Sequence, residues 1–69
     1  MKRLRELREK RRMSQILLGM ELNMSQNTVS RYETGEREPG IPELIAIADY
    51  FGVSVDYLLE RTDNPKVNR

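Results

Sequence analysis

Two short helical segments separated by only three residues constrain this chain more than any other feature. Ser14 and Ser25 each precede a run of helix-forming residues, the usual place of an N-cap, where a hydroxyl accepts a hydrogen bond from a free backbone N–H. Asn23 lies between the runs and readily adopts the left-handed conformation of a helix end. The pattern predicts helices over 15–22 and 26–33 joined by a tight turn, which is a helix-turn-helix.

The segments on either side of this motif also have helical patterns. Residues 2–12 are rich in Arg, Lys, Leu and Glu, which are good helix formers. Pro42 fits the first position of a fourth helix, which Gly52 ends. Ser54 is the expected N-cap of a short fifth helix over 55–60. No strand pattern is evident, so we expect an all-α domain of five helices.

Apolar residues recur at helical spacing in each segment and define the expected core. They are Leu4, Leu7, Leu18, Leu22, Val29, Tyr32, Leu44, Ile47, Ala48, Phe51 and Leu58. Met24, in the turn, is suited to fill the angle between two helices. Residues 62–69 contain Pro65 and little apolar material, so we expect one domain over 1–61 and a flexible tail over 62–69.

Composition excludes several classes of function. The 69 residues include no Cys and no His, which rules out disulfides, thiolate or imidazole metal sites and catalysis by either side chain. Glu36 and Glu38 form the most evident carboxylate pair, in a polar loop without apolar neighbours to raise a pKa. We therefore expect a non-enzyme without a cofactor, metal or evident small-molecule ligand. No apolar run is long enough for a membrane span, and a chain without Cys suits the cytoplasm.

A net charge of +1 conceals an uneven distribution along the chain. Residues 1–12 hold seven cations against two carboxylates, a net charge of +5, and residues 13–69 hold five cations against nine carboxylates, a net charge of −4. A polarised domain can present a basic face to phosphate groups. Composition supports a merely solvated, charged helix equally well. A membrane-surface helix is disfavoured because only Leu4 and Leu7 line its apolar face.

The third helical segment carries the residues best suited to reading bases. If Val29 and Tyr32 face inward, the outward face is left to Gln26, Asn27, Ser30 and Arg31. The amide side chains match the N6 and N7 atoms of adenine, and an arginine fork matches O6 and N7 of guanine. An ordinary solvated face would carry Glu and Lys pairs instead. The sequence therefore favours a helix that reads the major groove of double-stranded DNA.

These residues resemble a known family, the Cro and phage-repressor type of helix-turn-helix domain. The resemblance rests on MSQILLGMELNMSQNTVSRYETGEREP at 13–39 and continues, with lower specificity, through LIAIADYFGVSVDYLL at 44–59. It implies a five-helix lambda-repressor-like fold in which the second and third helices form the motif. It also implies a DNA-binding transcriptional regulator of the prokaryotic cytoplasm or of a phage-infected cell.

The resemblance assigns roles to matching positions. It implies base contacts by Gln26, Asn27 and Arg31, with Ser30 as a weaker candidate. Phosphate contacts are implied for Gln15, Ser25, Thr28 and Arg37, although Ser25 fits the role of a helix cap equally well. Arg8 and Glu33 match a pair that forms a salt bridge in the family, so the basic first helix is not expected to face DNA throughout.

Two departures from the family pattern affect the second helix. Gly19 stands where the family usually has Ala, which permits a close helix crossing but costs about 1 kcal/mol of helix propensity. Ile16 and Leu17 stand where the family tends to be polar, and at most one of them is expected to turn inward. An exposed apolar pair there points to a protein contact, an engineered change or local packing.

We expect a repressor that binds a palindromic operator as a homodimer, with its self-contact around Tyr57, Leu58 and Leu59. Core packing is the alternative role of Leu58. The competing hypothesis is a protein-binding module of the same fold, such as an antitoxin or anti-repressor component, for which Ile16 and Leu17 are the supporting feature. The sequence is compatible with a whole protein and with the N-terminal part of a longer repressor.

Overall fold

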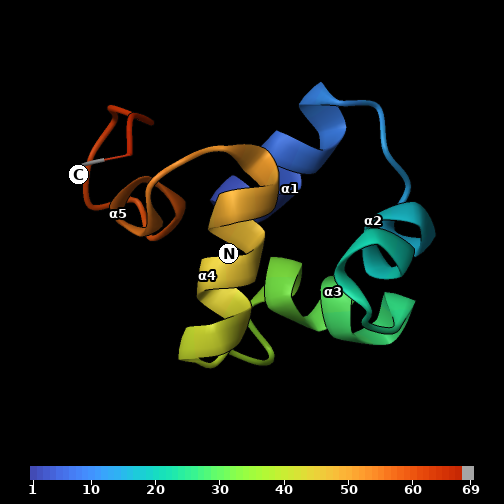
Figure 1. Cartoon of the computed structure of the whole chain (residues 1–69). Coiled ribbons are helices and arrows are strands. Elements are labelled where there is room, and N and C mark those ends of the chain that lie inside the picture. The colour runs from blue at the N-terminus through green and yellow to red at the C-terminus, as the bar shows by residue number, and fades with distance from the viewer. Residues whose placement is uncertain (68–69) are drawn as a thin grey trace.

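The structure is a computed structural model that describes residues 1–67 (Figure 1). All regular structure in these residues is helical, which confirms the expected all-α fold of five helices. The helices are α1 (Lys2–Lys10), α2 (Gln15–Leu22), α3 (Gln26–Thr34), α4 (Ile41–Phe51) and α5 (Val55–Leu58). The helix-turn-helix of α2 and α3 lies at one end of the molecule, α5 lies at the other, and α4 runs between them. None of these helices has the length and apolar character that a membrane crossing requires.

Serine residues begin three of the helices. The hydroxyl groups of Ser14, Ser25 and Ser54 each accept a hydrogen bond, at 3.0–3.1 Å, from the backbone N–H three residues later. Each bond satisfies a first-turn N–H that has no partner inside its helix. The three N-caps predicted from the sequence are thus confirmed.

Left-handed residues end the helices, and three of them were predicted. Asn23 (φ 55°), Gly35 (φ 85°) and Gly52 (φ 67°) follow α2, α3 and α4. After α2 the chain changes direction, and a hydrogen bond of 2.8 Å from the Met24 N–H to the Gly19 carbonyl closes this turn. The same carbonyl also accepts from the Asn23 N–H, so both residues after the last turn are bonded to the end of α2.

The predicted ends of α1 and α5 were wrong by two residues each. α1 stops at Lys10 rather than Arg12, and α5 stops at Leu58 rather than Glu60. Arg12 (φ 56°) and Glu60 (φ 61°) are themselves left-handed, and the following N–H groups bond back to carbonyls of the last turn. These residue types ordinarily continue a helix, so composition gave no stop signal.

Two other boundaries differ from the prediction by one residue, and the remaining ones agree with it. α3 extends to Thr34 instead of ending at Glu33. α4 begins at Ile41, which places Pro42 at the second position instead of the first. Proline is tolerated there because the N–H groups of the first turn have no partner inside the helix.

The core lies where the helices converge and matches most of the expected residues. Buried side chains come from every helix and from the α4–α5 connection: Leu4, Leu18, Val29, Tyr32, Ile47, Ala48, Phe51, Val53 and Leu58. Leu7, Leu22, Met24 and Leu44 are only half-buried and pack around this group. Leu58 is fully covered, so its side chain belongs to the core and not to an exposed contact surface.

The turn of the helix-turn-helix brings backbone against backbone at Gly19. A Cβ atom added to Gly19 would lie 2.5 Å from the carbonyl oxygen of Met24, far inside normal van der Waals contact. The absence of a side chain at Gly19 therefore allows the C-terminal half of α2 to lie directly against the turn that leads into α3.

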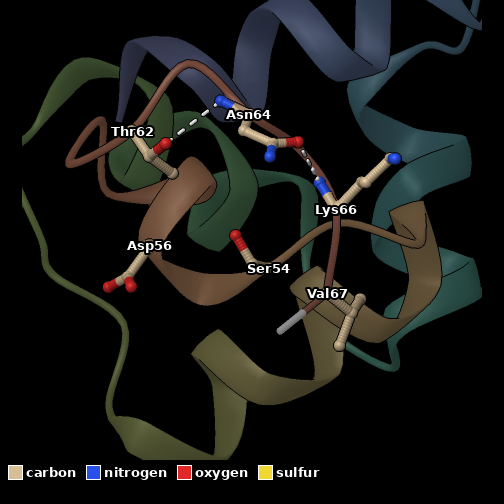
Figure 2. A pocket seen from close by; sticks show the side chains of 6 residues that line it. All are labelled: Ser54, Asp56, Thr62, Asn64, Lys66 and Val67. Atoms are coloured by element: carbon tan, nitrogen blue, oxygen red, sulfur yellow. Dashed lines mark hydrogen bonds between the residues drawn. The ribbon is translucent and has the colours of Figure 1, made fainter. Parts of the chain in front are cut away.

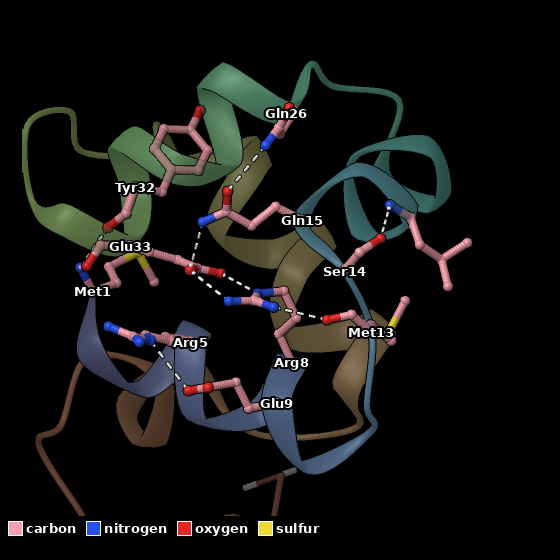
Figure 3. Close-up of polar contacts among 11 residues, drawn as sticks. Met1, Arg5, Arg8, Glu9, Met13, Ser14, Gln15, Gln26, Tyr32 and Glu33 are labelled. Atoms are coloured by element: carbon pink, nitrogen blue, oxygen red, sulfur yellow. Dashed lines mark hydrogen bonds and ion pairs between the residues drawn. The ribbon is translucent and has the colours of Figure 1, made fainter.

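A buried ion pair joins α1 to α3 (Figure 3). Arg8 Nε lies 2.6 Å from Glu33 Oε2, and Arg8 Nη2 lies 3.1 Å from Glu33 Oε1. The side chains are only 12% and 4% exposed. Arg8 also donates to the Met13 carbonyl at 2.7 Å. Hydrogen bonding to Glu33 raises the pKa of Arg8, although partial burial opposes this shift.

The segment after α5 folds back on the domain (Figure 2). The Ser54 N–H donates to the Pro65 carbonyl at 3.0 Å. Thr62 Oγ1 accepts from the Asn64 N–H, and Asn64 Oδ1 accepts from the Lys66 N–H, both at 3.1 Å. The expectation of a flexible tail over 62–69 stays a prediction for 62–67, and its last two positions lie outside the described residues.

Replacing Gly19 by Ala tests the close approach at the turn. The alanine gains about 1 kcal/mol of helix propensity, but displacing a backbone carbonyl costs about 2–3 kcal/mol. We therefore expect Gly19→Ala to lower the free energy of unfolding by about 1–2 kcal/mol, measured by urea denaturation. Ala46→Gly, at an exposed position of α4, calibrates the propensity term. A Gly19→Ala variant more stable than the parent would show that the turn relaxes freely.

Removing either partner of the buried ion pair leaves the other charge without compensation. We expect Arg8→Met and Glu33→Met each to lower the free energy of unfolding by about 3 kcal/mol. The double variant should lose less than either single variant, because it leaves no unpaired charge. Urea denaturation of the four proteins gives the coupling energy. Additive losses would contradict a direct interaction.

Candidate nucleic-acid interface

The exposed face of α3 gathers hydrogen-bonding side chains that no other element covers in residues 1–67. Val29 and Tyr32 are buried on the inner face, while Gln26, Asn27 and Arg31 are exposed on the outer one. Because α3 begins at Gln26, the two amide side chains lie in its first turn. This face can donate and accept hydrogen bonds at its N-terminal end, where a helix can approach a groove most closely.

The hydroxyl residues of α3 are less available than the amides. Ser30 and Thr28 are half-buried. Ser25 Oγ accepts from the Thr28 N–H and also shares a hydrogen bond of 2.9 Å with Thr28 Oγ1. Ser25 therefore acts as a helix cap in this structure, and both hydroxyl groups already have a partner.

Gln15, the first residue of α2, connects the interior with the exposed face of α3 (Figure 3). Its Nε2 donates to Glu33 Oε1 at 3.0 Å, and its Oε1 accepts from Gln26 Nε2 at 3.4 Å. One N–H of the Gln15 amide remains free to donate elsewhere. Gln15 and Gln26 were expected in the interface and Glu33 in an ion pair with Arg8, but the two hydrogen bonds that connect them were not predicted.

The cations near α3 are held loosely. Arg31 Nε lies 3.9 Å from Glu36 Oε2, and both side chains are more than half exposed. Such a pair contributes little free energy and opens easily. Arg37, in the loop after α3, is also exposed. Both guanidinium groups can therefore reach an external anion.

Several cations in and just after α1 serve the fold instead. Besides Arg8, Arg3 lies over the Tyr57 ring at 4.0 Å and pairs with Asp63 at 3.6 Å. The close contact with Tyr57 raises the pKa of Arg3, although burial opposes this shift. Arg11 lies 4.9 Å from the centre of the Phe51 ring and donates to the Phe51 carbonyl at the C-terminal end of α4. The cluster of positive charge in 1–12 is thus only partly available to a partner.

An apolar strip lies on the outer side of α2. Ile16 is 57% exposed, Leu17 is 42% exposed, and Met20 is 72% exposed. Neither Ile16 nor Leu17 turns inward, which agrees with the expectation that at most one of them would, because Leu18 and Gly19 occupy the buried side of this short helix. Met20 was missed, although its spacing of four residues from Ile16 could have revealed it.

The described residues contain no group of three or more carboxylates able to hold a metal ion.

Comparison with known proteins agrees with this geometry. A family model described as helix-turn-helix matches residues 4–58. The chain is 36% identical over 67 residues to the HTH-type transcriptional regulator ImmR of Bacillus subtilis (strain 168), a match that covers 97% of this chain and 53% of the relative. It is 33% identical over 69 residues to the uncharacterized HTH-type transcriptional regulator YobD of the same strain, with 97% of this chain and 62% of the relative covered.

The uncharacterized HTH-type transcriptional regulator YqaE of the same strain is 34% identical over 64 residues, and the match covers 93% of this chain and 55% of the relative. The chain thus spans a little over half the length of the curated relatives it matches. No solved structure gives a significant match. The family match covers most of the chain, including most of α1 and all of α2 to α5, and the chain belongs to the helix-turn-helix family, in its Cro and phage-repressor type.

Proposed function

We propose that this chain is a sequence-specific DNA-binding domain that inserts α3 into the major groove and represses transcription. The observation that carries the proposal is the exposed face formed by Gln26, Asn27 and Arg31. The opposite face of the same helix is packed into the core. Its donors and acceptors match the edges of bases. The relatives are named transcriptional regulators, which supports a regulatory role for this chain as well.

The contacts divide into two classes. Gln26, Asn27 and Arg31 read base edges, and Ser30 contributes at the margin of the groove. Phosphate oxygens are bound by the free N–H of Gln15, by the free backbone N–H groups at the start of α2, and by Arg37. Thr28 and Ser25 share a hydrogen bond, so their hydroxyl groups can contact phosphate only with the donor that this bond does not use.

We propose that two copies bind a palindromic operator. The longest dimension of the Cα trace is 30 Å, whereas successive major-groove sites on one side of DNA lie about 34 Å apart. One domain can therefore read one half-site, and a second copy supplies the other. Leu59, 44% exposed after α5, and the half-buried Tyr57 lie away from α3 and form the contact between copies. A dimer on a promoter acts in the cytoplasm by excluding other proteins from the DNA.

Selection from a pool of duplexes with 20 randomised base pairs tests the proposal as a whole. We expect enrichment of a sequence with two inverted half-sites about one helical turn apart. A single enriched half-site would exclude the dimer but keep the reading of bases. No enrichment at all would exclude sequence-specific binding.

A second candidate function has its own supporting observation, the exposed strip of Ile16, Leu17 and Met20. Such a strip suits a module that binds another protein, as an antitoxin or anti-repressor component does. The variant Gln26→Ala/Arg31→Ala separates the two functions. Under the second one it would retain its protein partner, and neither it nor the parent would bind DNA.

Removal of Arg31 should weaken DNA binding, and the chain offers a matched control. Arg61 also lies in a loose, exposed ion pair, 4.0 Å from Asp56, and it follows α5 at the far end of the domain. We expect Arg31→Ala to raise the Kd for the selected duplex about tenfold or more, because a bidentate base contact is lost. Arg61→Ala should change it less than about twofold. Equal effects of the two variants would mean that only net charge matters.

Binding should depend on salt only moderately. If Arg31 and Arg37 are the cations that approach DNA, two domains release about 2–4 counterions, and log K falls with log salt with a slope of about −2 to −4. Titration of the selected duplex with KCl measures the slope. A slope steeper than about −8 would mean that the cations of α1 also face the phosphates. A slope of zero would contradict docking on the DNA backbone.

A further inference from the structure

A chain of hydrogen bonds runs from the buried ion pair to the exposed front of α3 (Figure 3). Arg8 is bound to Glu33, Glu33 accepts from Gln15 at 3.0 Å, and Gln15 accepts from Gln26 at 3.4 Å. The chain crosses three helices, because these residues belong to α1, α3 and α2 in turn before it returns to α3. A side chain of the candidate reading surface is thus connected to a charge in the interior.

The buried end of this series of hydrogen bonds determines which group donates and which accepts at each link. A carboxylate paired with arginine can only accept hydrogen bonds, so Gln15 must turn its NH₂ group toward Glu33. The carbonyl oxygen of Gln15 then faces Gln26, which must in turn donate with its own NH₂ group. Either amide turned the other way would set two oxygen acceptors against each other and leave a hydrogen bond unmade.

The consequence lies at the exposed edge of Gln26. A primary amide has one oxygen and two N–H groups, and one N–H is given to Gln15. The outward edge therefore keeps one acceptor and one donor side by side. Adenine offers the complementary pair, a donor at N6 and an acceptor at N7, whereas guanine offers two acceptors, O6 and N7.

We propose that Glu33, acting through Gln15, fixes the orientation of the Gln26 amide and thereby makes Gln26 select adenine over guanine. Glu33 is then a positioning residue and a determinant of sequence specificity, although its own side chain is 4% exposed. The inference rests on the proposed function, because it requires that Gln26 reads a base.

The experiment compares base preference in variants that keep Gln26 but break the chain of hydrogen bonds. The probe is a duplex taken from the random pool, and the base pair read by Gln26 is the one at which Gln26→Ala loses its preference. Kd is then measured for adenine and for guanine at that position. We expect the parent protein to favour adenine about tenfold or more.

Two variants break the chain at different links. Gln15→Met removes the link between Glu33 and Gln26 and leaves the ion pair of Arg8 and Glu33 intact. Arg8→Met/Glu33→Met removes the buried acceptor without leaving an unpaired charge. We expect each to lower the preference for adenine to about threefold or less. Ser14→Ala is the control, because it weakens the cap of α2 without touching the chain, and its preference should equal that of the parent.

A preference that survives in both variants would overturn the proposal and leave Glu33 with a structural role. If affinity falls for both duplexes and the ratio of the two Kd values stays the same, the proposal is also overturned. Loss of a phosphate contact by Gln15 would produce this result. A preference lost equally in Ser14→Ala would also overturn it, since any weakening of α2 would then suffice.

Side-chain amide NMR of the free protein separates this failure from a failure of the proposed function. We expect the Nε2 protons of Gln15 to exchange slowly and to shift in Arg8→Met/Glu33→Met. If they do so but the protein binds no duplex, the proposed DNA-binding function is wrong, and the proposed selectivity for adenine is wrong as well. If they exchange freely in the parent protein, the link to Glu33 is absent and the proposal is wrong even if DNA is bound.

Discussion

The carboxylate of Glu33 is the constraint around which this small domain is arranged. A nearly buried charge must be compensated, and Glu33 obtains its partners from α1, through Arg8, and from α2, through Gln15. Both helices are therefore fixed against the C-terminal half of α3. The front of α3 is left free as a result, because the contacts that hold the helix lie on its inner side and near its end.

Local sequence determined the helix boundaries wherever the residue type carried a conformational preference. Asn23 and Gly52 tolerate positive φ, so the ends of α2 and α4 could be read directly. Arg12 and Glu60 adopt the same conformation without any such preference, and there the predicted helices ran two residues too long. Tertiary packing and backbone hydrogen bonds after the last turn impose these ends, and a one-dimensional pattern of residue types does not record them.

Some features of the candidate interface could likewise be predicted from the sequence, and others could not. Helical spacing from Val29 and Tyr32 was enough to predict that Gln26, Asn27 and Arg31 face outward, whereas Ser30, predicted with them, is half-buried. Spacing could not predict that Gln15 lies between Glu33 and Gln26, since those residues are far apart in sequence and meet only after the helices pack. The sequence suggested an exposed apolar pair at Ile16 and Leu17 but not the addition of Met20, which is exposed because Leu18 and Gly19 fill the buried side of the short helix α2.

Contacts within the domain also determine which positive charges remain available at its surface. Arg3, Arg8 and Arg11 belong to the most basic part of the chain, yet each is held by aromatic rings, carbonyls or a carboxylate of the domain itself. A sequence with concentrated positive charge thus folds into a domain whose candidate reading surface has few cations. On such a surface the arrangement of hydrogen-bond donors and acceptors must do more to distinguish sequences than charge does, because attraction to phosphate is the same for every base pair. The orientation of each amide, and whatever fixes it, then becomes a matter of specificity as well as of stability.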